Sequence, residues 1–280
     1  MPNNTLNNGF RLLETMARNP KPWSVAELAV TLDLPKSHVH RLLTSLVELG
    51  YLERPAQSRA YQVDVKLFEL ASALAAEHPL RRLSGTALRR LADQSRGSAY
   101  LIVWHDGAPL VLAVDHFGGR RPGTVLEVGK RLDRHSTASG KLFLAMLGLD
   151  PTAPELTSRT EYTIVDREQF TQELATIRAT QVSISRGEAG SGIFAFAVPV
   201  YDREEKIVAA VGLVVETPRV KTTGEAIWVG HCAEAARNLS AALGFTGLYP
   251  VDVDAPVLPV RTTTNSAPAV AVSRPMQPKP

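Results

Sequence analysis

Side chains able to contact nucleic acid gather in one short segment, LPKSHVHRLLTSLVELGYLER at residues 34–54. Arginine can read guanine through its forked donors, lysine binds phosphate, and serine, threonine and histidine can bind either bases or backbone. Apolar residues recur through the segment at helical spacing, so the polar side chains should share the outer face of a helix. An isolated face of this kind is more often only solvated, so its interpretation depends on the neighbouring elements. The candidate DNA contacts are Lys36, Ser37, His38, His40, Arg41, Thr44 and Ser45.

A second polar segment, HSTASGKLFL at residues 135–144, could bind an anion. Its SGK triplet is not a phosphate-binding loop, because that motif needs glycine where His135 stands. Nor is it a nucleophile elbow, since Ser139 lacks a glycine two residues earlier. What remains is a helix start at which Ser136, Thr137 and free backbone N–H groups attract negative charge. A helix that is merely capped there explains the residues equally well.

The other candidates for chemistry are weak. RGEAGSGIF at residues 186–194 lacks the glycine spacing of a dinucleotide fingerprint, so we expect a turn or loop entering a strand. No metal-ligand spacing links His105, His116, His135 and His231, and no nucleophile–base or paired-carboxylate arrangement stands out. We therefore expect no catalytic residue, no metal site and no cofactor.

The composition predicts a soluble chain with two domains. Its 280 residues exceed one average domain, and 44% of them are hydrophobic. The single cysteine, Cys232, excludes an intrachain disulfide. Neither a membrane span of about 18 apolar residues nor a signal-peptide layout is present, which favours the cytoplasm. The net charge is +3, but residues 1–80 carry eight Lys or Arg against eight Asp or Glu. DNA binding must then depend on where the charges lie.

Two helices are predicted before the polar segment. The first runs over about residues 8–18 and ends at the NPKP sequence that follows it. Its apolar face should comprise Phe10, Leu13 and Ala17. Ser24 and Glu27 form a capping box that opens the second helix.

The polar segment itself predicts a third helix followed by a hairpin. Pro35 suits the first turn, and Gly50 suits the end. YLERPAQSRAYQV then reads as two short strands around a turn with Arg54 and Arg59, which we expect to bind the DNA backbone. Residues 1–64 thus have the plan of a winged helix-turn-helix, whose last helix enters the major groove. A linker helix is predicted over residues 65–79, with an apolar stripe of Leu67, Leu70, Ala71 and Leu74.

Residues 80–249 predict an antiparallel sheet flanked by helices, an α+β domain. The Asp-Gly pair at 106–107 between two apolar runs signals a hairpin, and a second hairpin is expected over residues 193–216. We also expect a strand at 124–128, a helix capped by Asp166, and a last helix over about 224–243. Residues 250–280 hold seven of the nineteen prolines and are predicted to form a disordered tail.

Three segments together resemble the IclR-type transcriptional regulators. They are residues 34–54, VGKRLDRHSTASGKLFLA at 128–145, and GEAGSGIFAFAVPVYDREEKIVAAVGLVV at 187–215. Their order and spacing are similar to the family over about residues 8–245. The resemblance implies an N-terminal winged helix-turn-helix, a linker helix and a GAF-like α/β effector domain. It also implies a dimer or dimer of dimers on pseudo-palindromic double-stranded promoter DNA.

The effector implied by the resemblance is a small organic acid, whose carboxylate would lie on backbone amides at Ala138 and Ser139. Members that bind very small polar acids carry an Asp, a Cys and two Ser around the ligand. The matching positions here are Ser185, Ala195, Gly212 and Val214. Most of those polar groups are lost, so we expect a roomier, more apolar site for an aromatic or branched acid or a neutral derivative. The full predicted set is Thr124, Leu126, Leu132, Ala138, Ser139, Ser185, Ala195, Gly212 and Val214.

The hypothesis is therefore a DNA-binding regulator whose operator affinity changes when an acid binds, through the helix of residues 65–78. Two alternatives stay open: an enzyme acting on a small acid, and a nucleoid-type DNA binder whose sensor domain is vestigial. His38 stands where a small hydroxyl residue such as threonine is common in the family, so no operator sequence carries over.

Overall fold

The structure is a computed structural model that describes residues 4–119 and 126–251. Contacts within the chain divide it into two units, residues 1–89 and residues 90–280. The predicted effector residue Thr124 and the segment after residue 251 lie outside the described residues.

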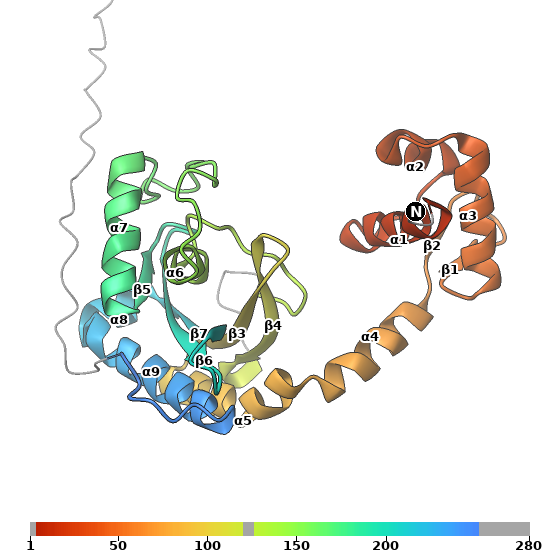
Figure 1. The fold of residues 1–280 in the computed structure, drawn as a ribbon. Coiled ribbons are helices and arrows are strands. Elements are labelled where there is room, and N and C mark those ends of the chain that lie inside the picture. Colours follow the sequence, from red (N-terminus) through yellow and green to blue (C-terminus); the bar gives the residue numbers. More distant parts are fainter. Residues whose placement is uncertain (1–3, 120–125, 252–280) are drawn as a thin grey trace, which may run out of the picture. The chain divides into compact units, whose positions relative to one another are not determined.

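The first unit is built on α1 (Asn4–Arg18), α2 (Val25–Leu32) and α3 (Lys36–Glu48), followed by a hairpin of β1 (Leu52–Glu53) and β2 (Gln62–Val63) (Figure 1). The predicted capping box is confirmed. The Glu27 backbone N–H donates to Ser24 Oγ at 3.2 Å, and the Ser24 backbone N–H donates to Glu27 Oε2 at 2.8 Å. The core comprises Leu12, Met16, Trp23, Leu28, Ala29, Leu32, Val39, Leu42, Leu43, Leu46, Leu52 and Tyr61.

The face of α1 that packs differs from the prediction. Leu12 and Met16 are fully buried, whereas Phe10, expected on the apolar face, is 58% exposed. The helix begins at Asn4 and packs against α3 and β2. Phe10 lies about 200° around the helix from Leu12, because each residue advances the helix by about 100°. Tertiary contact, and not the spacing of apolar residues alone, therefore decided which face is buried.

The segment predicted to be a linker helix forms helix α4 (Val65–Glu77), and α5 (Pro79–Ser95) follows after His78. The described residues leave the apolar stripe of α4 largely uncovered. None of its side chains is buried among the described residues, and Leu74 is 75% exposed.

The second unit contains a five-stranded antiparallel sheet in the order β4-β3-β7-β6-β5. The strands are β3 (Ser98–His105), β4 (Ala108–His116), β5 (Ser183–Arg186), β6 (Ile193–Tyr201) and β7 (Ile207–Glu216). The Asp-Gly hairpin is confirmed between β3 and β4, where Asp106 and Gly107 both have positive φ, 47° and 75°. This backbone matches the twist of the two strands.

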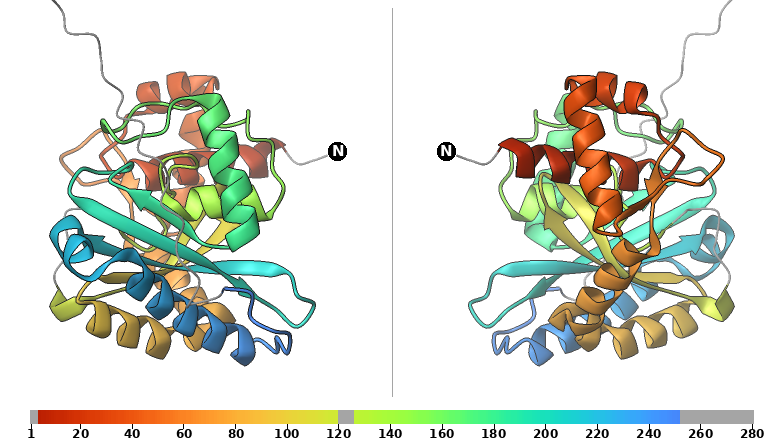
Figure 2. Two further views of the ribbon diagram at one scale, coloured as in Figure 1. Left: turned by 90° about the vertical axis from the view of Figure 1, so that its left-hand side faces the viewer. Right: turned by 90° about the vertical axis from the view of Figure 1, so that its right-hand side faces the viewer.

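Helices cover both faces of the sheet (Figure 2). α6 (Ala138–Met146) packs on one face with α7 (Arg167–Thr180) beside it, and α9 (Glu225–Ala242) packs on the other. The connections include a short 3-10 turn (Phe117–Gly119) and α8 (Thr217–Thr223). Successive strand residues alternate between the faces, so odd and even positions of β7 enter two different cores. The core under α6 contains four of the candidate effector residues, Leu126, Ala138, Ala195 and Val214.

The predicted strand at 124–128 is not found in its described part. Leu126–Val128 forms no strand, and a turn with Gly129 at φ 85° follows. The Val111 N–H donates to Lys130 O at 2.9 Å, and the Gly129 N–H donates to Val111 O at 2.8 Å. The segment therefore meets β4 through a turn and a single bridge at Arg131 instead of a continuous ladder.

Candidate DNA interface and effector site

The polar face predicted for α3 lies on the outside of the first unit. Its leucines are buried, so the opposite side of the helix faces solvent. No side chain caps the helix at Pro35, which leaves the positive end of the helix dipole without an anionic partner. The exposed residues are Lys36, Ser37, His40, Arg41, Thr44 and Ser45, and His38 is half-buried. This face can contact both phosphates and base edges.

His38 links this face to α1. Arg41 Nη2 lies 3.3 Å from His38 Nδ1, and Asn8 Nδ2 lies 3.3 Å from His38 Nε2. A neutral imidazole has one acceptor nitrogen, so it can accept from only one of these two donors at a time. Arg11 also donates to Asn8 Oδ1 at 3.3 Å. Asn8 and Arg11 were missed from the sequence, because the contact of Asn8 with His38 and that of Arg11 with the Leu32 carbonyl depend on helix packing.

Arg54 and Arg59 are both exposed on the hairpin. The Arg54 guanidinium lies 5.5 Å from the ring centre of Tyr61, and its Nε donates to Ser58 O at 3.4 Å. A cation over an aromatic ring is held there by the ring's negative face. The hairpin thus presents two exposed positive charges, of which Arg54 is held over the Tyr61 ring.

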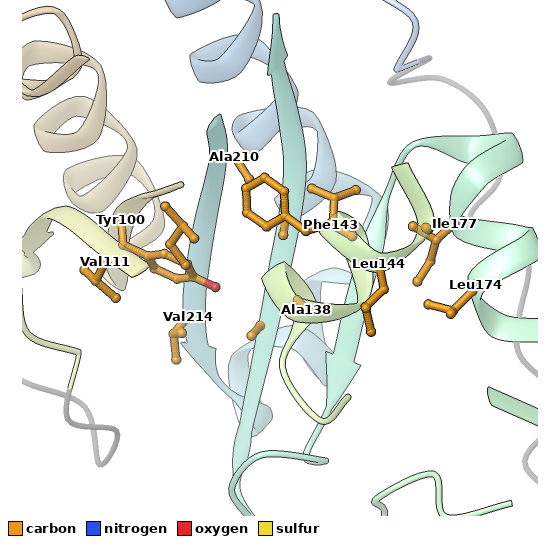
Figure 3. Close-up of a cluster of buried hydrophobic side chains, with 14 of the residues drawn as sticks. Tyr100, Val111, Ala138, Phe143, Leu144, Leu174, Ile177, Ala210 and Val214 are labelled. Carbon is orange, nitrogen blue, oxygen red and sulfur yellow. The ribbon is translucent and has the colours of Figure 1, made fainter. Parts of the chain in front are cut away.

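In the second unit, the register brings the predicted effector residues onto one face of the sheet. Ser185, Ala195 and Val214 are direct neighbours on β5, β6 and β7, and Gly212 stands two residues along β7. Opposed residues in an antiparallel sheet point to the same face, which here is the face covered by α6. Figure 3 shows part of this core, to which Leu126, Ala138, Ala195 and Val214 belong and against which Leu132 packs.

The start of α6 is tightly built. Thr137 caps it by accepting from the Gly140 N–H at 3.1 Å. A Cβ on Gly140 would lie 2.4 Å from the carbonyl oxygens of Asp133 and Arg134, so only glycine allows this approach. Ser139, in the first turn, is fully buried, and its hydroxyl has no hydrogen-bond partner among the described residues.

A carboxylate organises the loop before α6. Asp133 Oδ1 accepts from the backbone N–H groups of His135 and Ser136, each at 2.9 Å, and lies 2.7 Å from His135 Nδ1. Burial favours the neutral acid, but these N–H groups, His135 and Arg159 outweigh it and hold the pKa of Asp133 below its ordinary value. Ser185 Oγ donates to Ser136 O at 2.8 Å, which ties β5 to the same loop.

Two further hydroxyl groups lie in the neighbouring row of the sheet and were missed from the sequence. Tyr100, Gly212, Ala197 and Ser183 follow one another across β3, β7, β6 and β5. A Cβ on Gly212 would lie 2.2 Å from Tyr100 Cζ, so the phenol ring occupies the room that glycine leaves. The extra space expected at Gly212 is therefore already filled. The Ser183 hydroxyl is buried without a partner among the described residues.

Lys141, the lysine of the SGK triplet, is fully buried, and its partners are two carboxylates and a backbone carbonyl. It is therefore not the lysine of a phosphate-binding loop. Its Nζ donates to Glu188 Oε1 at 2.6 Å, Glu173 Oε1 at 3.0 Å and Ile184 O at 2.9 Å. Burial alone would lower the pKa of Lys141, but the two carboxylates hold it above its ordinary value. Burial raises the pKa of Glu188 despite Lys141. The ion pairs join α6, α7 and the loop after β5.

The described residues contain neither a candidate metal site nor a candidate membrane-spanning helix. No three His, Cys, Asp or Glu side chains within residues 4–119 and 126–251 could jointly hold a metal ion. In the same part of the chain, no helix combines the length and apolar character needed to cross a bilayer.

Comparison with known families decides the class. The IclR helix-turn-helix domain matches residues 5–56, and the bacterial transcriptional regulator IclR C-terminal domain matches residues 72–241. The chain belongs to the IclR family of transcriptional regulators. It is a DNA-binding regulator with a helix-turn-helix domain and a C-terminal α/β domain, which confirms the predicted fold class.

Individual relatives agree. The glycerol operon regulatory protein of Streptomyces griseus is 30% identical over 246 residues, covering 85% of this chain and 94% of the relative. The crystal structure of Thermotoga maritima IclR is 24% identical with a TM-score of 0.66, covering 86% and 99% of the two chains. An IclR homologue of Microbacterium hydrocarbonoxydans, solved in complex with 4-hydroxybenzoate, is 23% identical with a TM-score of 0.72 and the same coverage. Relatives are named as regulators and not as enzymes, which confirms the expected class.

Proposed function

We propose that this IclR regulator binds a small organic acid at the start of α6 and that the acid changes its affinity for an operator. The observation that carries the proposal is the Ser139 hydroxyl, buried in the first turn of α6 without a partner among the described residues. Buried hydroxyls are nearly always hydrogen-bonded, so an unsatisfied one beside the positive end of a helix suits a carboxylate.

The surroundings support an acid with an apolar body. Ala138, Ala195 and Val214 line the buried face with apolar atoms, and Ser185 already donates to the loop before α6. An acid of two or three carbons would meet few free donors there to replace its hydration. The homologue in complex with 4-hydroxybenzoate supports an aromatic acid as the first class to test. Residues 80–249 are accordingly assigned to effector binding.

We assign residues 1–64 to DNA binding. Within this domain α3 would enter the major groove, and the hairpin would contact the DNA backbone. Arg41 is exposed and forked, so it is the best candidate for reading guanine. Lys36, Arg54 and Arg59 would neutralise phosphates, which should make binding strongly salt-dependent.

We further propose that a second copy covers α4, the linker of residues 65–79. Leu70 and Leu74 of its apolar stripe are 43% and 75% exposed, and helix-turn-helix dimers read two half-sites of a pseudo-palindrome. A dimer, or a dimer of dimers, would bury this apolar stripe. Sedimentation of the full chain tests it, since Leu74→Asp should shift the protein towards monomer and a matched Glu69→Gln should not.

A gel shift tests the whole proposal, with DNA from upstream of the protein's own gene and full-length protein. Benzoate, 4-hydroxybenzoate and branched aliphatic acids are added across a concentration series. A regulator gives a shift that an acid changes, a nucleoid-type binder gives a shift that ignores every acid, and an enzyme gives none. Ser139→Ala should weaken the response to acid while leaving the shift without acid unchanged. An unaltered response in that variant would contradict the site.

A further inference from the structure

The hydroxyl of Tyr100 is a buried polar group whose purpose the fold does not explain. The residue is only 2% exposed, and none of the side-chain hydrogen bonds found among the described residues involves its hydroxyl. Burial raises the pKa of Tyr100 well above its ordinary value, so the phenol stays protonated and can donate. Unsatisfied buried hydroxyls cost free energy, and satisfaction by a ligand is one explanation of their presence.

The ring is held in place by its neighbours. A Cβ at Gly212 would lie 2.2 Å from both Tyr100 Cε2 and Cζ and 2.6 Å from its Oη. Glycine at this position on β7 is therefore what allows the phenol to lie across the strand. Val111 and Val214 belong to the same buried core, and Figure 3 shows the hydroxyl turned toward the side on which Val214 and Ala138 lie. The fold thus delivers one hydroxyl to the middle of the face covered by α6.

Other groups on this face complete a pattern. Ser139, at the start of α6, has a buried and unpartnered hydroxyl among the described residues. On this face β6 carries the small side chains Ala195 and Ala197, with Val214 opposite Ala195, and the Tyr100 ring lies over Gly212 of β7. The face therefore offers an anion site at one side, an apolar floor, and a separate neutral donor over the floor.

We propose that Tyr100 is a specificity-determining residue of the effector site, hydrogen-bonding a hydroxyl or keto oxygen of an acid whose carboxylate lies at the start of α6. The inference rests on the proposed function, because it assigns a second contact to the same ligand. It narrows the effector from any apolar acid to one with a polar group remote from the carboxylate.

Calorimetric titration of the full-length protein tests it with matched acids: benzoate against 4-hydroxybenzoate, and phenylacetate against 4-hydroxyphenylacetate. Wild type should bind the hydroxylated member of at least one pair about three- to tenfold more tightly, as one neutral hydrogen bond predicts. Tyr100→Phe keeps the ring over Gly212 and removes only the hydroxyl. In that variant the two members should bind within about twofold of each other, with the unsubstituted acid binding as it does in wild type.

Tyr201→Phe is the matched control, because this phenol on β6 donates to Gln181 instead of facing α6. It should keep the wild-type preference. If Tyr100→Phe also keeps it, or if wild type binds both members equally, the role of Tyr100 is wrong while the acid site stands. If wild type binds no acid and the gel shift ignores them all, the proposed function fails and the inference fails with it.

Discussion

The outer face of α3 and the face of the sheet under α6 both carry polar side chains, but in opposite surroundings. Lys36, Ser37 and Arg41 lie in water, which satisfies their donors until DNA replaces it. Ser139, Ser183 and Tyr100 are buried, where an unsatisfied hydroxyl is costly. A polar side chain without a protein partner is therefore ordinary on α3, where water can bind it. Under α6 the same observation indicates a ligand, because a buried hydroxyl without a partner is costly.

Charges follow the same contrast. The lysine of α3 is solvated, whereas Lys141 on α6 is surrounded by two carboxylates and a carbonyl oxygen. A solvated charge can be exchanged with little effect on stability, since water screens it. A buried charge with fixed partners cannot be removed without leaving those partners uncompensated. The largest predicted effect therefore lies under α6.

Lys141→Met should be the most damaging substitution. It leaves Glu173 and Glu188 buried without their counter-ion, and we expect a loss of about 3–5 kcal/mol in the free energy of unfolding. Burial already raises the pKa of Glu188 and Lys141 opposes that rise, so removing the lysine should favour protonation of Glu188 and make the loss smaller at pH 5 than at pH 8. Urea unfolding followed by circular dichroism at both pH values measures it.

Lys130→Met serves as the control, because this lysine is exposed on the turn before α6. Its substitution should change stability by less than about 0.5 kcal/mol. The double variant with Lys141→Met and Glu188→Gln should recover part of the loss, since it removes one of the two stranded charges. A loss below about 1 kcal/mol for Lys141→Met alone would show that the cluster is not a buried ion pair of this kind.

The two regions also differ in what their sequences could reveal. Helical periodicity alone separated the buried leucines of α3 from its polar face, and the capping box fixed where α2 begins, so this unit was largely predictable. The face of α1 was not, because Phe10 and Leu12 are both apolar and only packing chooses between them.

Under α6, the resemblance identified Ser139, Ser185 and Gly212, and the structure places Ser185 and Gly212 on strands of the sheet face that α6 covers. Tyr100 and Ser183 could not be found in this way. The alternation of strand residues predicts that the Tyr100 and Ser183 side chains each point to one face of the sheet. It does not predict which residue of β7 lies opposite Tyr100. A one-residue slip in register would have moved every side chain to the other face.

Arg41→Ala should have the next largest effect, on DNA binding and not on folding. Losing a two-pronged contact to guanine costs about 1–3 kcal/mol, or roughly 5- to 150-fold in operator affinity. Arg41→Lys keeps the charge and loses the fork, so it should lose sequence discrimination while retaining the dependence on salt. Fluorescence anisotropy on operator and scrambled DNA over a salt series measures both.

Arg18→Ala is a suitable control for Arg41, because this exposed arginine at the end of α1 pairs with Glu14. His38→Ala should weaken operator binding less than Arg41→Ala, since its contact with Arg41 is long at 3.3 Å. Equal affinity of Arg41→Ala and wild type for the operator would remove Arg41 from the base-reading role.

The smallest effect concerns the exposed capping box of α2, where solvent weakens every contact. The Ser24 backbone N–H, then its hydroxyl and Lys21, lower the pKa of Glu27 to about 2 from an ordinary value near 4.5. Because the folded pKa is the lower one, this carboxylate stabilises α2 fully above pH 4.5. Its contribution should disappear as the pH falls from about 4.5 towards 2. Hydrogen exchange of the α2 amides at pH 6, 4 and 3 measures the change.

Glu27→Gln should abolish that pH dependence in α2, while Glu14→Gln on α1 should leave it intact. Ser24→Ala removes the reciprocal half of the box and should cost about 1 kcal/mol at neutral pH. If α2 exchanges at the same rate in Glu27→Gln and wild type at pH 6, the cap is dispensable, and the position of α3 depends on the core leucines alone. The difference between the two sites would then be larger, because neutralising the solvated Glu27 would not change stability, whereas removing the buried Lys141 would.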